Sequence, residues 1–396
     1  MDLGAKNLEL GRDCYYERTV QRQALPALAC AAHTEVLVVG GGLAGMSCAL
    51  DLAERGRDVL LLDAGLLCAQ ASGRNGGQAI AGYACGQPAL EAMLGFTDAR
   101  RLWELSLASL ALMRERISRH RIDCGATWSY LTVADRPAKA RALRHEAMHM
   151  LRLYGHDMPY VEGAELARHI GSSRYEAGLL DPASGHLNPL QYGLGLARAA
   201  QALGARLHEP VRAEQVLLAG NCGLLWQSPD LAPALRPRIM PVGTYVVATE
   251  PLPEATAHAL LPTQAAVCDN NFVLDYYRIA PDRRLLFGGR VSYTTATPGR
   301  LTEAMRQRML RVFPQLSGTR IEHTWGGFVD ISRERAPDWG RLDEGLYYVQ
   351  GFSGGRARIR VRMILKPFQS KSARPYVTRA LCYGGNGRCC RSAHSG

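Results

Sequence analysis

The sequence predicts an α/β fold with two domains, and two patterns support this prediction. In residues 34–65 a short apolar strand, a glycine turn, an apolar helix and a second apolar strand follow in order, as in a parallel sheet with a crossover helix. Later segments combine amphipathic helices with short strands joined by tight turns, as in an α+β domain. We therefore expect one domain built on a parallel sheet and a second with a mixed, mostly antiparallel sheet.

Length and composition suit a globular protein of this kind. The chain has 396 residues, of which 47% are hydrophobic and 21% charged, which is enough for two domains with separate cores. Its net charge of +11 is concentrated at the C-terminal end, because residues 356–396 contain ten of the 47 Lys and Arg residues and none of the 36 acidic ones. The rest of the chain is nearly neutral, which argues against nucleic acid as a partner.

Cysteine usage and the N-terminal sequence predict a cytoplasmic protein. The 11 cysteines form no CxxC pair and no Cys/His cluster with zinc-ligand spacing, so we expect no metal site and a reducing compartment. The first residues, MDLGAKNLELGRD, carry charges where a secretory signal would be apolar. Apolar runs such as DVLLLDAGLLCA are too short for a membrane span, and none is expected.

The first informative motif is a dinucleotide-binding fingerprint. The strand EVLVV runs into Gly40, Gly42 and Gly45, which form G-x-G-x-x-G at the start of a helix. Gly40 permits a tight turn, Gly42 lets backbone N–H groups approach a pyrophosphate, and Gly45 lets the helix pack on the strand. The next strand, DVLLLD, ends in Asp63, whose carboxylate would accept hydrogen bonds from ribose hydroxyls. Because strand, glycines, helix, strand and acid occur in the required order, the motif predicts a bound dinucleotide.

The segment after this motif bears on which dinucleotide is bound. A simple NAD domain continues from its second strand into another helix, whereas this chain continues into the polar, glycine-dense segment ASGRNGGQ at residues 71–78. Glycine allows the backbone to come close to a large planar ligand, which favours a flavin. The same composition is typical of a surface loop, so the residues alone leave both interpretations open.

The chain is identified as a member of the D-amino-acid-oxidase-like flavoproteins, and it most resembles the gamma-glutamylputrescine oxidase group. The resemblance extends over residues 15–354 and is carried by VVGGGLAGMSCALDLAERG, ASGRNGGQ, SGHLNPLQYGLGLARAA, TYVVATEPLP, LDYYRIAPDRRLLFGGRVSY, APDWGRL and LYYVQGFSG. It implies a Rossmann-like FAD-binding domain and a mixed, mostly antiparallel substrate-binding domain, both discontinuous in sequence.

The resemblance also implies where these domains lie. The FAD-binding domain would comprise residues 31–90, 188–227 and 322–354. The substrate domain would comprise residues 91–187 and 228–321. An N-terminal extension at 1–30 and a tail at 355–396 would lie outside both domains.

Cofactor-binding residues follow from the matching motifs. The residues implied to bind FAD are Gly40, Gly42, Leu43, Ala44, Gly45, Asp63, Ser72, Arg74, Asn75, Gly76, Gly77, Gly351, Ser353 and Gly354. No cysteine occurs where covalently flavinylated relatives attach the ring, so we expect non-covalent FAD.

The strands in LDYYRIAPDRRLLFGGRVSY are expected to supply the catalytic, pocket-lining groups. Tyr276 and Tyr277 are neighbours on one strand, so their side chains point to opposite faces and one of them faces the pocket. Arg278 is the third candidate, and either it or Arg290 would pair with a substrate carboxylate. For each of these residues, packing or surface charge is the alternative interpretation. His186 in SGHLNP is interpreted as a turn or interface histidine rather than a base.

The implied reaction is oxidation of the C–N bond of a small amine or amino compound similar to gamma-glutamylputrescine, giving an imine or aldehyde, with dioxygen as the electron acceptor. Two alternatives stay open. One is a dehydrogenase of the same fold that passes electrons to another acceptor, and the other is an inactive remnant of the flavin-binding fold.

Two segments depart from the family pattern. Residues 209–210 lead directly into VRAEQVLLAGN, where relatives have a further hairpin of about two strands, so we expect an exposed sheet edge. After Gly354, relatives continue with His-Gly and a long apolar helix whose N-terminus points at the flavin. Here residues 355–396 are rich in Arg, lack acids and contain three cysteines.

We interpret residues 355–396 as an atypical basic tail that is read out of frame, because GC-rich genes in the wrong frame yield Arg-rich, acid-poor sequence. A basic arm for nucleic acid is the alternative, but no aromatic or Gly-rich binding pattern accompanies it. In this interpretation the activity of the family is unchanged, and any impairment of flavin retention or folding is specific to this chain.

Overall fold

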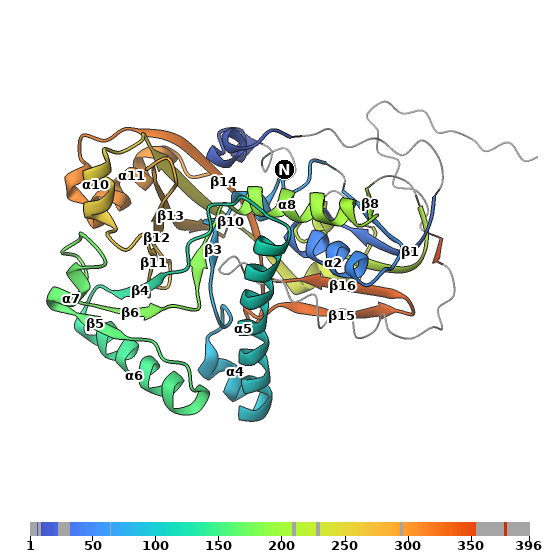
Figure 1. Ribbon diagram of the computed structural model, residues 1–396, viewed down its shortest axis with the longest axis horizontal. Coiled ribbons are helices and arrows are strands. Elements are labelled where there is room, and N and C mark those ends of the chain that lie inside the picture. Colours follow the sequence, from blue (N-terminus) through green and yellow to red (C-terminus); the bar gives the residue numbers. More distant parts are fainter. Residues whose placement is uncertain are drawn as a thin grey trace, which may run out of the picture.

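The computed structural model describes residues 6, 9–22, 32–63, 65–207, 211–226, 230–293, 296–353 and 376–377. These residues form a seven-stranded sheet, an eight-stranded sheet and a two-stranded sheet, with helices packed around them. In Figure 1 the seven-stranded sheet, with β1, β15 and β16, lies to the right, and the eight-stranded sheet, with β4, β5 and β6, lies to the left. The predicted α/β fold with a second, mixed sheet is confirmed.

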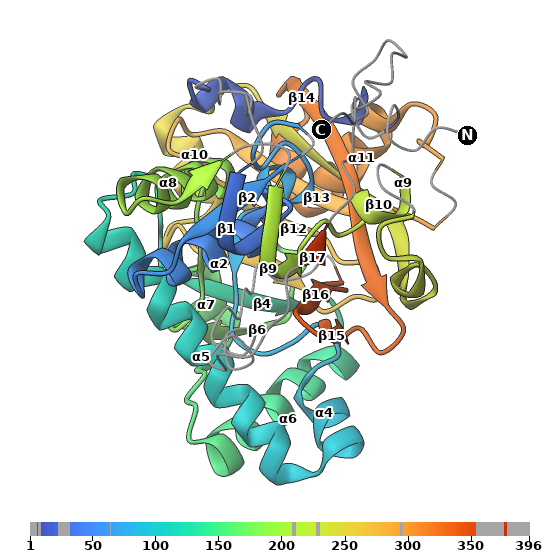
Figure 2. The same ribbon diagram turned by 90° about the vertical axis from the view of Figure 1, so that its right-hand side faces the viewer.

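The seven-stranded sheet is mainly parallel, with the order β15-β16-β9-β1-β2-β8 and β17 beside β9. Strand β15 is antiparallel to β16, and β17 is antiparallel to β9. Figure 2 shows β2, β1 and β9 side by side. The strands of this sheet are β1 (Ala32–Val39), β2 (Val59–Leu62), β8 (Arg206–Leu207), β9 (Val211–Leu218), β15 (Asp338–Asp343), β16 (Leu346–Gln350) and β17 (Tyr376–Val377).

The apolar run predicted as the first strand forms the centre of this sheet. Its Val36 and Val38 are buried in one core, and Leu37 is buried in another on the opposite face. Burial on both faces explains why the run is continuously apolar. Val39 pairs with Leu62 at the end of β2, and β9 ends at the same level. The carboxyl ends of the parallel strands therefore share one edge, which is where ligands bind in open α/β sheets.

The eight-stranded sheet has the order β14-β10-β13-β12-β11-β4-β6-β5. Only β4 and β11 pair in parallel among these described strands, so the sheet is mostly antiparallel as predicted. Its strands are β4 (Tyr130–Ala134), β5 (Tyr160–Glu162), β6 (Ala177–Asp181), β10 (Ile239–Thr249), β11 (Ala266–Asp269), β12 (Tyr276–Ile279), β13 (Leu285–Ser292) and β14 (Ile321–Ser332), and the two-stranded sheet consists of β3 (Gln78–Ala79) and β7 (Gly185–His186). The expected boundary at residue 322 falls at the start of β14, and the division into two domains stays a prediction.

Helices cover both sheets. Helix α2 packs against α8 beside the parallel sheet. Helices α10 and α11 lie at the upper left in Figure 1, where α11 contacts β10, β13 and β14 of the other sheet. Among the described residues, no helix combines the length and apolar character that a membrane span requires. The α-helices are α2 (Leu43–Glu54), α3 (Ala71–Arg74), α4 (Gln87–Leu94), α5 (Phe96–Arg119), α6 (Pro137–Tyr154), α7 (Gly163–Ala167), α8 (Pro189–Ala202), α9 (Gly223–Trp226), α10 (Glu254–Leu260) and α11 (Leu301–Val312).

A buried ion-pair cluster links α5 to α2. Arg116 in α5 is only 1% exposed. Its guanidinium donates to the Ser47 hydroxyl at 2.7 Å and to the Asp51 carboxylate at 3.3 Å, both in α2. The long helix is thus tied to the glycine-loop helix by polar contacts as well as by apolar packing.

The N-terminal residues 9–22 pack onto the larger sheet, although the sequence suggests only an extension there. Their 3-10 helix η1 (Tyr15–Thr19) places Tyr16, which is 0% exposed, in the main core. The Tyr16 ring meets Trp325 of β14 edge-to-face, with ring centroids 5.6 Å apart. The Asp13 carboxylate accepts a hydrogen bond from the Thr324 backbone N–H at 2.9 Å.

Several predictions fall outside the described residues. These are the role of Gly354, the link at 208–210 where the hairpin is missing, and the tail at 355–396 apart from the two residues of β17. The side chain of Arg290 is also outside what the structure describes.

Candidate active site

The edge formed by the parallel strands brings together the glycine turn, Asp63 and the Gly351–Ser353 turn. Each follows the carboxyl end of its strand, namely β1, β2 and β16. Because β1 lies between β2 and β9, and β16 pairs with β9 on its other side, these segments line one edge of the sheet. The sequence predicted that these segments belong to one site, and the topology brings them to one edge.

The glycine turn is built so that helix α2 starts directly on the strand. Gly40 has a φ of +112°, which favours glycine, and its N–H donates to the Leu62 carbonyl at 2.7 Å. A Cβ at Gly45 would lie 1.9 Å from the Gly40 carbonyl oxygen. Gly42 is the N-cap residue of α2, so the first backbone N–H groups of that helix lie at the turn. Only glycine therefore fits at position 45. The partial positive charge at a helix N-terminus of this kind favours a phosphate.

Asp63 lies beside this turn rather than pointing into solvent. Its Oδ2 accepts a hydrogen bond from the Gly41 N–H at 2.6 Å, and its Oδ1 accepts one from the Gly65 N–H at 2.8 Å. Burial raises the pKa of the Asp63 carboxyl, while these two N–H groups lower it. The acid predicted to hold a ribose is therefore fixed in place by two backbone donors.

Helix α3 is fastened to the start of α2 through Ser72. The Ser72 hydroxyl oxygen accepts a hydrogen bond from the Leu43 backbone N–H at 3.0 Å. A Cβ added at Gly42 would lie 2.8 Å from the same oxygen. Ser72 therefore lies directly against the glycine turn, at Gly42 and Leu43.

Asn75 lies in the segment at residues 71–78 that the sequence predicts to contact the flavin, and its side chain forms three hydrogen bonds there. Its side-chain amide donates to the Ala71 and Ser72 carbonyls at 3.0 and 2.9 Å, and its carbonyl oxygen accepts from the Gly77 N–H at 2.8 Å. Gly77 has a φ of +72°. These hydrogen bonds are all local, so Asn75 shapes the Gly76–Gly77 turn.

Arg74 faces the N-terminal segment. Its side chain is buried, and a Cβ at Gly11 would lie 2.0 Å from the guanidinium carbon. Its carbonyl oxygen accepts a hydrogen bond from the Trp325 indole N–H at 2.9 Å. Burial lowers the pKa of the Arg74 guanidinium. The contacts that the structure gives to Arg74 therefore join α3 to β14 and to residues 9–22.

Tyr276 and Tyr277 point to opposite faces of β12, as the strand periodicity predicts. Tyr277 is 1% exposed and belongs to the second core, where its ring stacks on Phe287 with centroids 5.5 Å apart. Tyr276 is half-buried on the other face. A Cβ at Gly76 would lie 2.4 Å from its ring, and a Cβ at Gly288 would lie 2.1 Å from it. Tyr276 is thus the tyrosine that lies against the predicted flavin-binding turn.

Arg278 shares the Tyr276 face but is 2% exposed. Its Nε donates to the Gly76 carbonyl at 3.0 Å. Its Nη2 donates to the Tyr16 hydroxyl at 3.0 Å and to the Leu187 carbonyl at 3.1 Å. The contact with the Gly76 carbonyl holds the Gly76–Gly77 turn in place. The guanidinium itself is buried and surrounded by protein oxygens.

His186 in β7 is a buried neighbour of this group. Its Nε2 lies 2.9 Å from the Gln264 carbonyl oxygen, and its Nδ1 has no hydrogen-bond partner in the described part of the chain. Burial, and then the positive charge of Arg278, lower its pKa to about 3. His186 is therefore neutral near pH 7, with Nε2–H donating to Gln264 and Nδ1 left as a buried acceptor.

The Gly351–Ser353 turn is organised by Asp330 of β14, a residue that sequence analysis missed. The Gly351 N–H donates to the Asp330 carboxylate, and the Ser353 N–H donates to the Asp330 carbonyl at 2.7 Å. Asp330 is 1% exposed, and burial raises its pKa to about 7 against the opposing effect of backbone N–H groups, chiefly that of Gly351. Both Gly351 and Ser353 have positive φ angles, of 73° and 55°.

Sequence reasoning also missed Tyr16, because it lies in the segment predicted to be an extension. The signals for these missed residues were weak. Asp330 is an acid within the apolar strand GGFVDIS, and Tyr16 is the second residue of the aromatic pair YY at 15–16. Within the described residues, no group of three or more His, Cys, Asp or Glu side chains is arranged to hold a metal ion.

The residues at this edge fit an extended dinucleotide cofactor. A glycine turn that tolerates no Cβ at position 45, a helix N-terminus and a fixed carboxylate at Asp63 supply the features that a pyrophosphate and a ribose require. The Gly76–Gly77 turn lies against Tyr276 of β12 in the eight-stranded sheet.

Comparisons with known proteins show what the chain is similar to. Residues 35–357 match the family described as FAD dependent oxidoreductase (DAO). The gamma-glutamylputrescine oxidoreductase of Escherichia coli (strain K12) is 36% identical over 340 residues, which cover 81% of this chain and 79% of that protein.

Two solved structures share the fold. Glycine oxidase from Bacillus cereus ATCC 14579 superposes with a TM-score of 0.65 at 20% identity, covering 84% of this chain and 92% of that one. L-Proline dehydrogenase from P. horikoshii superposes with a TM-score of 0.67 at 18% identity, covering 82% and 89%. At these identities the similarity establishes the fold alone.

Proposed function

We propose, from the premise that the chain belongs to the DAO family of FAD-dependent oxidoreductases, that it oxidises the C–N bond of a gamma-glutamylated amine. The family assignment confirms the predicted resemblance, and FAD is the cofactor of the family. The observation that carries the substrate proposal is the 36% identity to a gamma-glutamylputrescine oxidoreductase over most of both chains.

The residues of the parallel-sheet edge would hold the cofactor without a covalent bond. The start of α2 would bind the pyrophosphate, Asp63 the ribose, and the Gly76–Gly77 turn would lie along the flavin ring. The other cofactor-binding residues predicted from the sequence would also contact FAD. Gly351 and Ser353 would lie near the pyrimidine edge of the flavin ring. FAD supplies a two-electron acceptor for the hydrogen on the carbon next to nitrogen.

The chain's own residues would position the amine. Tyr276 is the pocket-lining candidate, since it lies against the Gly76 turn, and a strand-borne side chain is held more firmly than one on a loop. We assign Arg278 a positioning role instead of a contact with a substrate carboxylate, because its donors already serve three protein oxygens. Tyr277 would act through packing of the second core.

The decisive experiment uses the purified chain with FAD added and then removed by desalting. Retained flavin absorbance tests the cofactor site. Anaerobic addition of gamma-glutamylputrescine, putrescine, glycine and proline then tests the substrate. We expect gamma-glutamylputrescine to bleach the flavin absorbance at a lower concentration than the other three compounds. Equal bleaching by free putrescine would contradict the proposal that the enzyme recognises the glutamyl group.

The same preparation distinguishes the electron acceptor. We propose dioxygen, and turnover in air with release of hydrogen peroxide would support it. Turnover only with an artificial dye would instead identify a dehydrogenase, and a chain that retains no flavin would support the inactive remnant. We also propose a cytoplasmic location, since the described cysteines are all free thiols.

A further inference from the structure

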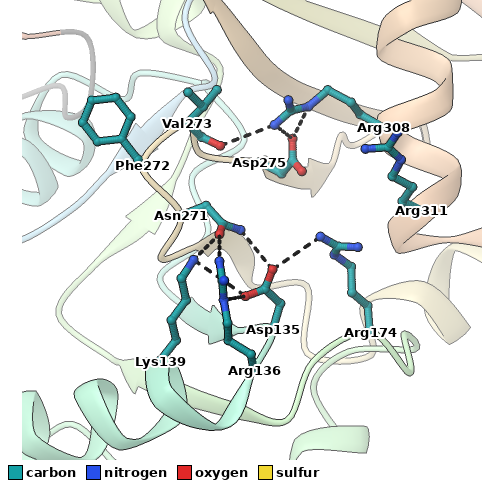
Figure 3. A pocket seen from close by; sticks show the side chains of 10 residues that line it. All are labelled: Asp135, Arg136, Lys139, Arg174, Asn271, Phe272, Val273, Asp275, Arg308 and Arg311. Atoms are coloured by element: carbon teal, nitrogen blue, oxygen red, sulfur yellow. Dashed lines mark hydrogen bonds and ion pairs between the residues drawn. The ribbon is translucent and has the colours of Figure 1, made fainter.

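A polar cavity lies outside the candidate active site. It has a volume of about 480 Å³ and opens between the start of α6, the β11–β12 connection and α11. Figure 3 shows Arg308 and Arg311 reaching toward it from α11, with Asp135, Arg174 and Lys139 facing them from the other side. None of its lining residues belongs to the glycine turn, the Gly76 turn or the Gly351 turn.

The charges around this cavity do not balance. Five of the lining side chains are cationic and two are carboxylates. The cations come from separate parts of the chain: two from the start of α6, one from the α7–β6 connection and two from α11. Such convergence concentrates positive potential in a concave space, where it attracts anions more strongly than the same charges spread over a surface.

One carboxylate, Asp135, is shared among three cations at long range. Its oxygens lie 3.4 Å from the Arg136 Nε, 3.7 Å from the Lys139 Nζ and 3.4 Å from the Arg174 Nη2. The Arg174 Nε–H is buried and has no hydrogen-bond partner within the described ranges. This wall of the cavity therefore keeps positive charge and at least one donor that its own acid does not satisfy.

On the opposite wall, Arg308 and Arg311 differ in their partners. Arg308 forms an ion pair with Asp275 at 2.7 Å. Arg311 is exposed and forms no ion pair with any carboxylate among the described residues. Arg311 is thus a cation available to a ligand in the cavity.

The loop between these walls is already ordered by its own hydrogen bonds. Asp269 accepts from the backbone N–H groups of Asn271 and Asp275, each at 3.1 Å. The Asn271 side chain donates to Asp269 and accepts from Lys139. A ligand would therefore meet a largely preformed site and pay little ordering entropy.

We propose that this cavity binds a small anion with at least two negative charges, of the phosphate-ester or polycarboxylate class. Arginine guanidinium groups bind phosphate and carboxylate oxygens through paired N–H donors. The N-terminus of α6, an 18-residue helix, adds partial positive charge at the same wall. A cavity of this volume accommodates a small organic molecule.

The test is binding of inorganic pyrophosphate and of citrate to the FAD-loaded chain, measured by isothermal titration at constant ionic strength set with sodium chloride. We expect one saturable site for at least one of the two probes. In the double variant Arg174→Gln/Arg311→Gln, the Kd of the bound probe should rise by about tenfold or more for each arginine lost. The matched control is Arg141→Gln/Arg152→Gln, which removes the same charge from exposed positions of α6 outside the cavity.

The outcomes separate cleanly. Binding of pyrophosphate alone identifies the phosphate-ester class, and binding of citrate alone identifies the polycarboxylate class. Absence of saturable heat with both probes would overturn the proposal, as would equal weakening in the test and control variants, because that would indicate diffuse surface charge. If the double variant fails to fold, Arg311→Gln alone serves, since Arg311 is exposed and unpaired in the described chain.

Discussion

The Arg278 guanidinium donates a hydrogen bond to the Tyr16 hydroxyl oxygen at 3.0 Å, although the two residues are 262 positions apart in the chain. Both side chains are almost fully buried. The bond connects the N-terminal segment to the strand that carries Tyr276, and through the Gly76 carbonyl it reaches the turn assigned to the flavin. The N-terminal residues are therefore part of the support of the candidate active site.

This relationship predicts an unequal effect of removing two neighbouring hydroxyl groups. Tyr16→Phe should lower the free energy of unfolding by about 1–3 kcal/mol, because it leaves a buried guanidinium N–H short of an acceptor. Tyr15→Phe is the matched control. Its hydroxyl donates to the Asp282 carboxylate at 2.8 Å, but that side chain is 43% exposed, so water can replace the hydroxyl and its loss should cost only about 0.5–1.5 kcal/mol. Urea unfolding of both variants measures the difference, and equal losses would contradict a special role for the Arg278 contact.

The glycine turn predicts a loss of cofactor without a general loss of fold. Gly45→Ala places a Cβ 1.9 Å from the Gly40 carbonyl oxygen, so α2 must move away from the strand. We expect the variant to lose FAD on desalting. Gly299→Ala is the control, because a Cβ there meets nothing within 4 Å. Flavin absorbance per protein measures the outcome, and full retention by Gly45→Ala would show that the pyrophosphate binds elsewhere.

The two adjacent tyrosines predict a separation of activity from stability. Tyr276→Ala should lower kcat/KM by about tenfold to a hundredfold, because the amine loses a positioning surface, while the melting temperature changes little. Tyr277→Ala should cost about 3–5 kcal/mol of stability through a cavity beside Phe287. Steady-state kinetics and thermal unfolding are to be measured on both variants. A larger kinetic defect in surviving Tyr277→Ala protein would reverse the assignment.

His186 predicts a pH dependence of stability with a defined sign. Its pKa in the folded chain is about 3, against an ordinary value of 6.5, so the unfolded chain binds the proton more tightly. Stability is then lost as the pH falls from about 6.5 toward 3, by up to about 1.4 kcal/mol per pH unit.

Urea unfolding between pH 4 and pH 7 tests this sign. The free energy of unfolding should change less steeply with pH in His186→Asn, because one group fewer takes up a proton on unfolding. The Asn amide can still donate to the Gln264 carbonyl. The control is His258→Asn at an exposed position. Other titrating groups, including Asp275 with a pKa of about 6 and Asp330 with a pKa of about 7, are present in both variants and cancel in the comparison. Parallel profiles for the wild-type chain and His186→Asn would contradict the prediction.

Much of the cofactor site was predictable because its requirements are local. Gly40, Gly45 and Asp63 satisfy backbone conformation, close approach and strand-end position within one short stretch of sequence. The opposite orientations of Tyr276 and Tyr277 follow from strand periodicity in the same way. Features of this kind leave a fixed spacing in the sequence, which is what pattern analysis detects.

By itself, the sequence determined the α/β fold, the glycine fingerprint and the family to which the chain belongs. Only the tertiary structure decided that Tyr16 supports Arg278, that Asp330 holds the Gly351 turn, and that cations from distant segments converge on one cavity. The physical reason is that burial and charge convergence depend on contacts between residues far apart in the chain. Such contacts leave no regular spacing of residue types in the sequence, so they can be recognised only in the folded structure.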